Sequence, residues 1–378
     1  MEKANNNRKG GGSRVSRYFY YLVVLYMLAN VVALVPRILI QDRLNGTVMA
    51  LVIAIVLTMF YFYIFTNSML KFPGKGQPEI VLTYTPKWFA FTYLFFVAIL
   101  YFCSAWFILV SFIDITNIFI NPEMPSFLIG AVFLALVSFG ALMKTEKTLY
   151  ALEIVLLISL PLIIAIFFKA YFNQLLSWDA IKVVFIHSFE KPSISTIGAA
   201  SYSMIGFYFI SIYNRVLKPK VNKLKLIPFL LLGILATVNI FTSFLIPIGF
   251  NGVDGSENYI YPWFSTADSI RMEFGFIERV LFIFLLLYIG ISISTATITC
   301  HVGVETLKSI LPKKKWKGIA MVPSMILLVF SVFTISSPYL FSQVHIFDFS
   351  KFYFSLLLLV GAISCSVLLY AVRRSKSK

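Results

Sequence analysis

Apolar residues in this chain are gathered into blocks of about 20 residues, and this pattern constrains the fold more than any other feature. A helix of about 20 residues rises roughly 1.5 Å per residue, so it crosses about 30 Å of hydrocarbon. Inside lipid the backbone must satisfy its own hydrogen bonds, which makes each block a helix. A β-barrel would instead alternate apolar and polar residues in segments of about ten. The pattern therefore predicts an all-α membrane protein.

Ten such blocks are visible. The predicted spans are residues 18–40, 46–70, 88–112, 126–143, 150–168, 193–212, 226–248, 276–299, 319–340 and 352–372. Residues 18–373 are thus predicted to form a single transmembrane domain. The Asn- and Gly-rich residues 1–17 are expected to be a disordered cytoplasmic tail, and residues 374–378 a second, short cytoplasmic tail. Only 13% of the residues are charged, about half the share in soluble domains.

The basic residues are distributed unevenly between the two sides that ten spans would create. Lys and Arg total 32, and 24 of them fall on the side that holds both ends of the chain. Because cytoplasmic loops carry the excess of Lys and Arg, both termini are predicted to be cytoplasmic. This asymmetry accounts for the net charge of +16 and argues against nucleic acid as a partner. The basic loops either set the topology alone or also bind anionic lipid or a protein partner.

Ten spans divide into two groups of five. Many secondary carriers are inverted repeats of five helices, with the first helix of each repeat broken near the midplane. A 5+5 inverted-repeat carrier-type fold is therefore expected, with breaks in spans one and six. Span six contains Gly198 and Gly206 among small residues, which allow either unwinding or close helix packing. Span one lacks Gly but has Asn30 at mid-membrane and Pro36 near its outer end.

Residues around the two expected breaks are the candidates for a ligand site, because unwound backbone offers free N–H and C=O groups. The alternative is ordinary packing of small residues, with Asn30 as an interhelical hydrogen-bonding group. The candidate ligand-binding residues are Asn30, Val31 and Val32 from span one, and Ser201, Ser203, Gly206 and Tyr208 from span six.

Charged side chains at membrane depth are costly and need a partner or a function. Glu153, one turn into span five, is expected to pair with Lys147 or Arg215 or to line a cytoplasmic vestibule. Asp114 ends span three at the outer face, and Glu278 and Arg279 open span eight there. For the four candidate charges the alternatives are structural ion pairing and a gating role. They are Asp114, Glu153, Glu278 and Arg279.

Two longer loops, residues 169–192 and 251–275, are predicted on the outer face. The second contains Tyr261 and Trp263 among several acidic residues. Such a loop could be a lid, a partner surface or an interfacial aromatic belt.

Patterns of catalysis and metal binding are absent from the sequence. It contains no Gly-rich phosphate loop, no HExxH and no GxSxG. Cys103, Cys300 and Cys365 fall in or beside spans, fit neither a metal site nor a disulfide framework, and are expected to be buried apolar residues. No catalytic residue, metal site or cofactor is predicted, and the chain is not expected to be an enzyme.

Several short motifs bear on the family. Phe72-Pro73-Gly74-Lys75, followed by Glu79-Ile80, resembles a stretch after span two in the spore germination permease family. This family comprises the B subunits of nutrient germinant receptors, within the amino acid–polyamine–organocation superfamily. The following segments resemble other family motifs in the same order: the pair Glu146 and Glu153, residues 204–207, Tyr261-Pro262 and residues 276–279.

The chain departs from the family pattern at three places. Residues 28–33 lack the glycines that the family usually has in span one, Tyr208 stands in place of a usual Glu, and Leu281 in place of a frequent Asp. These departures favour a less charged nutrient than a free amino acid, or a lost ligand site.

The resemblance implies a subunit that senses a small nutrient, amino acid-like or other, in the inner membrane of a bacterial endospore. It would act with an A-type membrane subunit and a C-type lipoprotein. A secondary transporter for amino acids or related solutes is the main alternative, and a purely structural subunit is another.

Overall fold

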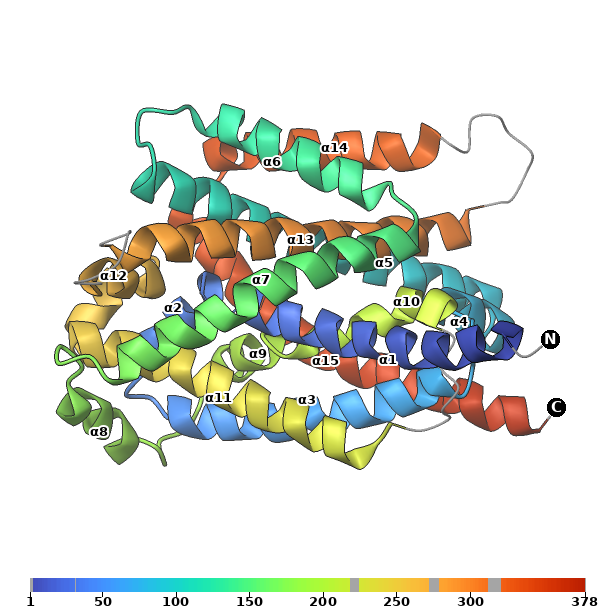
Figure 1. The fold of residues 1–378 in the computed structure, drawn as a ribbon, viewed down its shortest axis with the longest axis horizontal. Helices are drawn as coiled ribbons and strands as arrows, with labels where there is room; N and C mark the ends of the chain where they lie inside the picture. Colours follow the sequence, from blue (N-terminus) through green and yellow to red (C-terminus); the bar gives the residue numbers. More distant parts are fainter. Residues whose placement is uncertain (1–2, 31, 218–223, 272–278, 312–320, 378) are drawn as a thin grey trace.

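The computed structural model describes residues 3–30, 32–217, 224–271, 279–311 and 321–377, and its regular elements are helices. Most of them run along one common direction and form a bundle (Figure 1). The start of α1 and the end of α15 lie at the same end of this bundle, here termed the terminal end (Figure 1). The opposite end, which carries α8 and α12, is termed the distal end.

Within the described residues, seven helices are long and apolar enough to cross a membrane. They are α3 (Thr47–Leu70), α5 (Lys87–Phe119), α7 (Thr145–Tyr171), α11 (Leu226–Asn251), α13 (Val280–Ile310), α14 (Met321–Leu340) and α15 (Gln343–Lys376). α6 (Ser126–Ala141) is apolar but shorter. Each of these helices overlaps one of the predicted spans, so the prediction of a multi-pass, all-helical chain is confirmed.

Two further apolar stretches are bent helix pairs. The first joins α1 (Lys3–Asn30) to α2 (Leu34–Gln41), and the second joins α9 (Ile194–Tyr202) through the 3₁₀ helix η1 (Ile205–Phe209) to α10 (Ile210–Leu217). The remaining helices are short and lie at the ends of the bundle: α4 (Gln77–Tyr84), α8 (Trp178–Ile186), η2 (Gly255–Asn258) and α12 (Pro262–Ser269). α1 begins inside the segment expected to be a tail, whose disorder stays a prediction.

The first bent pair changes direction by 56° at the break predicted in span one. Pro36 lies in the first turn of α2, where it has no N–H to donate to the carbonyl of Val32, so an unbroken helix through this point would lose that hydrogen bond. The side-chain amide of Asn239 in α11 donates to the carbonyl of Met27 at 3.1 Å. A neighbouring helix thereby satisfies a carbonyl in the last turn of α1.

The second bent pair changes direction by 59° at the break predicted in span six. After α9 ends, the hydroxyl of Ser203 donates to the carbonyl of Ala200 at 2.7 Å, and the N–H of Met204 donates to the carbonyl of Ser201 at 3.0 Å. The chain then tightens into η1 before α10 begins.

The glycines of this pair also allow close packing. A Cβ on Gly198 would lie 2.8 Å from the backbone of Phe354 in α15, and one on Gly206 would lie 2.6 Å from the Cβ of Tyr26 in α1. The sequence allowed either unwinding or close helix packing for the small residues of span six. Both occur, because the helix unwinds at the break and neighbouring helices approach closely on either side of it.

At the distal end, the turn between α2 and α3 docks on the segment that leads into α9. The carboxylate of Asp42 accepts hydrogen bonds from the hydroxyls of Ser193, at 2.7 Å, and Thr196. Ser193 also caps α9 by accepting from the N–H of Thr196 at 3.1 Å. Gly46, with φ +70°, faces the carbonyl of Glu190. These contacts hold the distal halves of the two bent pairs together.

The second of the two longer loops lies at the distal end and packs into the protein rather than along its rim. Trp263 is fully buried and donates to the carbonyl of Ser243 at 2.9 Å, and Tyr261 is buried as well. The aromatic-belt interpretation is therefore wrong for these two residues, because their rings fill the space beneath α12. Trp178 in α8 remains exposed, as a belt residue would.

The three cysteines are free thiols. Cys300 and Cys365 are buried, as predicted, whereas Cys103 is half-buried.

Candidate functional site

A cavity of about 60 Å³ lies beside η1, between α1, α5 and α15. Four tyrosines belong to its wall: Tyr26, Tyr101, Tyr208 and Tyr353. Its other polar lining residues are Gln77, Ser104, Thr299 and Ser364, and the rest are apolar. The described residues of this wall include no acidic or basic side chain. The cavity thus combines an apolar surface with several hydroxyl groups, as small-molecule sites do.

A chain of hydroxyl groups connects the two bent pairs across this cavity. The hydroxyl of Tyr26 in α1 lies 3.4 Å from Oγ of Ser104 in α5, and that Oγ lies 2.6 Å from the hydroxyl of Tyr202, the last residue of α9. The rings of Tyr26 and Tyr202 also pack edge to face. The two bends are therefore linked by direct side-chain contacts.

The residues proposed from the sequence are spread over this region. Tyr208 lines the cavity. Asn30 lines a separate cavity of about 10 Å³, enough for about one water molecule, and its amide donates to the carbonyl of Tyr26 at 2.9 Å. Val32 is fully buried, and Val31 lies outside the described residues.

Ser201, Ser203 and Gly206 do not line the cavity of 60 Å³. Ser203 binds the backbone within its own turn. Ser201 is buried, and its Oγ has no hydrogen-bond partner within the described part of the chain. Gly206 lies against α1. A role of these three residues in ligand binding stays a prediction. The contacts of Ser203 and Gly206 instead show that these two residues help to form the break between α9 and η1 and to pack it against α1.

Replacing Gly206 by alanine is expected to lower stability by about 1–3 kcal/mol, because the added methyl group would lie 2.6 Å from the Cβ of Tyr26 and 3.1 Å from the Cα of Val23. The thermal unfolding midpoint of the purified protein in detergent, at fixed scan rate, measures the effect. Gly290→Ala is the matched control, because its new Cβ would meet only Cγ1 of Val155 at 3.9 Å. Equal midpoints for the two variants would contradict close packing at η1.

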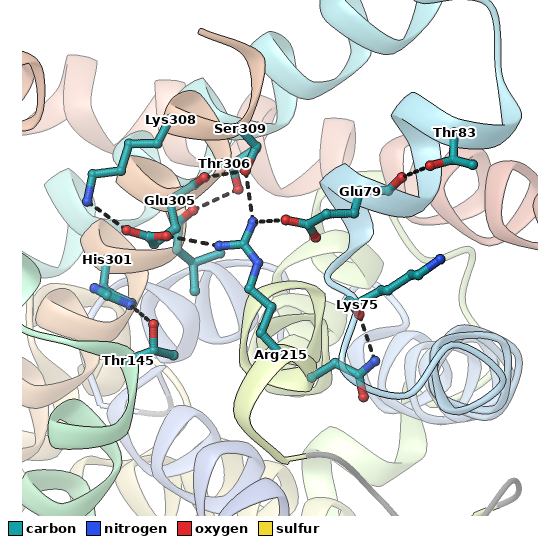
Figure 2. Close-up of polar contacts among 12 residues, drawn as sticks. Lys75, Glu79, Thr83, Thr145, Arg215, His301, Glu305, Thr306, Lys308 and Ser309 are labelled. Atoms are coloured by element: carbon teal, nitrogen blue, oxygen red, sulfur yellow. Dashed lines mark hydrogen bonds and ion pairs between the residues drawn. The ribbon is translucent and has the colours of Figure 1, made fainter. Parts of the chain in front are cut away.

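A second polar centre lies at the terminal end, around Arg215 of α10 (Figure 2). The guanidinium contacts Glu79 of α4 at 2.6 Å, Glu305 of α13 at 2.9 Å and the Oγ of Ser309 at 2.8 Å. Lys308 also contacts Glu305, at 2.7 Å. We term these five residues the Arg215 cluster. It ties the terminal half of the second bent pair to two other helices (Figure 2).

The loop that bears the family-like motif is built against the same half-helix. The side-chain amide of Asn214 lies within hydrogen-bonding distance of the carbonyls of Met69, Phe72 and Lys75, at 3.3, 2.9 and 2.8 Å. A Cβ on Gly76 would lie 2.7 Å from the carbonyl oxygen of Ser211 in α10. The motif thus fixes the position of α4 relative to the broken span.

The short helix α4 reaches both polar centres. Its first residue, Gln77, lines the cavity and donates to the hydroxyl of Tyr93 at 2.7 Å, which in turn donates to Ser364 at 2.8 Å. Two residues later, Glu79 belongs to the Arg215 cluster. This short helix therefore links the wall of the cavity to the terminal end of the bundle.

The charges singled out in the sequence have specific partners. Glu153 pairs with Arg17 of α1 and accepts from the hydroxyl of Tyr18 at 2.7 Å, so the expected pairing with Lys147 or Arg215 is wrong. Lys147 lies six residues earlier on the same helix and faces another direction, and Arg215 is held by its own cluster.

Two of the charges at the distal end contact the loop that carries α12. Asp114 accepts from the hydroxyl of Tyr261 at 2.8 Å, and Arg279 lies 3.8 Å from Asp268. Burial, and then the charge of Asp114, raise the pKa of Tyr261 well above its usual value, so the phenol remains a hydrogen donor. Glu278 lies outside the described residues.

Sequence reasoning missed the tyrosines of the cavity wall and the Arg215 cluster as a unit. Tyr26 and Tyr101 lie inside apolar blocks rather than at their ends, where interfacial tyrosines are usual, and this position was a usable signal. Tyr353 gave no such signal, because it is the second residue of the predicted span 352–372. The Arg215 cluster had none, because its members come from residues 79, 215 and 305–309 and meet only in the folded chain.

A bundle of long apolar helices, with two bent pairs beside a cavity lined by hydroxyl groups, defines a multi-pass membrane protein of permease type. Comparison with known families agrees. Residues 15–340 match the Spore_permease family, described as spore germination protein, and the chain belongs to this family. No curated relative matches the chain significantly.

Proposed function

We propose that this chain is the nutrient-sensing membrane subunit of a spore germinant receptor and that the nutrient binds in the cavity beside η1. Family membership supports a germination-related membrane function. The observation that carries the proposal further is the cavity itself, because it adjoins one bent pair and contacts the other through Tyr26. Membership in a permease family also points to a protein without enzymatic activity.

A ligand acts in such a sensor by binding one of two conformations more tightly than the other. Occupancy of the cavity would press on Tyr208 in η1 and Gln77 in α4, which share its wall. α4 and α10 meet again in the Arg215 cluster, so a shift of either helix changes the contacts there. We propose that this rearrangement at the terminal end is the signal that partner subunits read.

The remaining parts of the proposal concern topology and partners. Seven long helices, two bent pairs and α6 would together supply ten membrane crossings in a 5+5 arrangement. The terminal end, which holds both termini, would face the cytoplasm because of its Lys and Arg residues. We propose the spore inner membrane as the location, with an A-type membrane subunit and a C-type lipoprotein as partners.

A secondary transporter is the second candidate, because bent helix pairs are also how carriers build their substrate sites. Reconstituted vesicles separate the two functions. Sustained uptake of a nutrient driven by an ion gradient would favour transport, whereas saturable binding without flux would favour a sensor.

Deletion of the gene tests the sensing proposal. Spores without this chain are expected to lose the germination response to at least one nutrient and to recover it when the gene is restored. Germination by calcium dipicolinate, which is supplied from outside, serves as the control for spore integrity. An unchanged response to every nutrient, in a strain that lacks related receptors, would refute the proposal.

A further inference from the structure

Most hydroxyl groups in the wall of the cavity beside η1 already form hydrogen bonds within the protein, which limits the groups that can bind a ligand. Tyr101 contacts the carbonyl of Tyr208 and Oγ of Ser211, and Tyr353 donates to the carbonyl of Leu100 at 2.7 Å. Ser104 pairs with Tyr202 and Tyr26, Ser364 accepts from Tyr93, and Thr299 donates to the carbonyl of Thr295. These groups are satisfied by the protein.

Tyr208 is different. Its hydroxyl is buried and makes no hydrogen bond to oxygen or nitrogen within the described residues. The thiol of Cys365 lies beside it, but a thiol is a weak hydrogen-bonding group, and this one is directed to the carbonyl of Tyr61 at 3.7 Å. Leaving a buried hydroxyl without a partner costs free energy, which a ligand that supplies the partner would recover.

A glycine gives this hydroxyl its place against α15. A Cβ on Gly361 of α15 would lie 2.8 Å from the Tyr208 hydroxyl and 3.0 Å from the ring of Tyr61. At roughly 10–15 Å³ for each water-sized group, 60 Å³ holds about four to six non-hydrogen atoms. Because the described wall carries no charge, an ionic group seated here would be buried without a counter-charge.

We infer that the cavity binds a small uncharged molecule, or the uncharged part of one, whose carbonyl or hydroxyl oxygen accepts a hydrogen bond from Tyr208. This inference rests on the proposed function and names the chemical class of its ligand. It makes Tyr208 the specificity-determining residue of the site, with Gly361 providing the room in which the Tyr208 hydroxyl lies.

The test uses three probes of nearly equal size that differ in charge: propionamide, propionate and propylammonium. Each is titrated up to roughly 100 mM against the purified full chain in detergent, because ligands of about five heavy atoms bind weakly. Thermal stabilisation at constant ionic strength reports affinity. Propionamide is expected to bind at least about tenfold more tightly than either ion.

Two tyrosine variants test whether the Tyr208 hydroxyl contributes to the affinity for propionamide. Tyr208→Phe is expected to weaken propionamide binding about fivefold, the loss of one neutral hydrogen bond. Tyr288→Phe is the matched control, because Tyr288 also has a buried hydroxyl without a partner in the described structure but does not line the cavity. Its affinity for propionamide should equal that of the native chain.

The inference is overturned if either ion binds as tightly as propionamide, if propionamide does not bind, or if Tyr208→Phe leaves its affinity unchanged. None of these outcomes touches the proposed sensing function, which the deletion phenotype decides separately. Loss of germination on deletion together with preferential binding of propionate, for example, would keep the sensor and reject the uncharged ligand.

Discussion

Replacing Gly46 by alanine is expected to destabilise the protein by about 2–5 kcal/mol, the sum of about 1–2 kcal/mol for backbone conformation and about 1–3 kcal/mol for overpacking. A non-glycine residue in the left-handed region costs about 1–2 kcal/mol, and φ at Gly46 is +70°. The new Cβ would also lie 2.1 Å from the carbonyl oxygen of Glu190 and 2.8 Å from its carbon. Because both atoms belong to the backbone, relief requires the distal halves of the two bent pairs to separate.

Gly74 provides the matched control for this prediction. Its φ is +78°, but a Cβ added there would meet nothing within 4 Å, so Gly74→Ala should cost only the left-handed conformation, about 1–2 kcal/mol. Thermal midpoints of both variants, measured in detergent at one scan rate, give the comparison. If the two variants lost stability equally, the close approach of the α2–α3 turn to the segment before α9 would be wrong.

Replacing Arg215 by alanine is expected to cost about 1–3 kcal/mol and to loosen α4. The change leaves Glu79 and Glu305 without their shared partner, and these carboxylates are 42% and 20% exposed, so water screens part of the loss. Hydrogen–deuterium exchange is expected to rise in residues 72–84. Arg215→Lys should recover only part of the stability, because one ammonium cannot reproduce the planar contacts to two carboxylates and Ser309.

The exposed pair of Lys182 and Asp179 is the control for the Arg215 cluster. Their side chains are 75% and 90% exposed, so Lys182→Ala should change stability by no more than about 0.5 kcal/mol. A double-mutant cycle between Arg215→Ala and Glu305→Ala should show coupling, because the two side chains are in direct contact. Additive losses, or unchanged exchange in residues 72–84, would contradict a cluster that fixes α4.

The two breaks were predicted from the frame of two five-helix repeats that carriers share. The small residues around Gly198 and Gly206 supported the second break, because they weaken a helix locally. Pro36 alone could not have located the first break, since Pro161 and Pro247 lie inside continuous helices. Asp114, by contrast, was assigned to the outer face, but its partner Tyr261 is 147 residues away in sequence. Long-range pairing of this kind leaves no periodic signal in a single chain.

The candidate site was predictable only in part. Tyr208 follows a family-like motif and does line the cavity, whereas Ser203 and Gly206, chosen by the same argument, contact the protein itself. The sequence could not separate them, because a small residue beside a break has the same local pattern whether it faces a cavity or a helix. Tyr26, Tyr101 and Tyr353 were missed because each comes from a different span.

The sequence by itself determined that this chain is a multi-pass helical membrane protein of the spore germination permease family, because apolar block length and motif order are local properties. Only the tertiary structure decided which residues line the cavity and that α4 connects the cavity to the Arg215 cluster. It also showed that, among the described hydroxyl groups of the cavity wall, only that of Tyr208 has no hydrogen bond to oxygen or nitrogen. Those features depend on contacts between helices that are far apart in the chain, and folding alone brings these helices together.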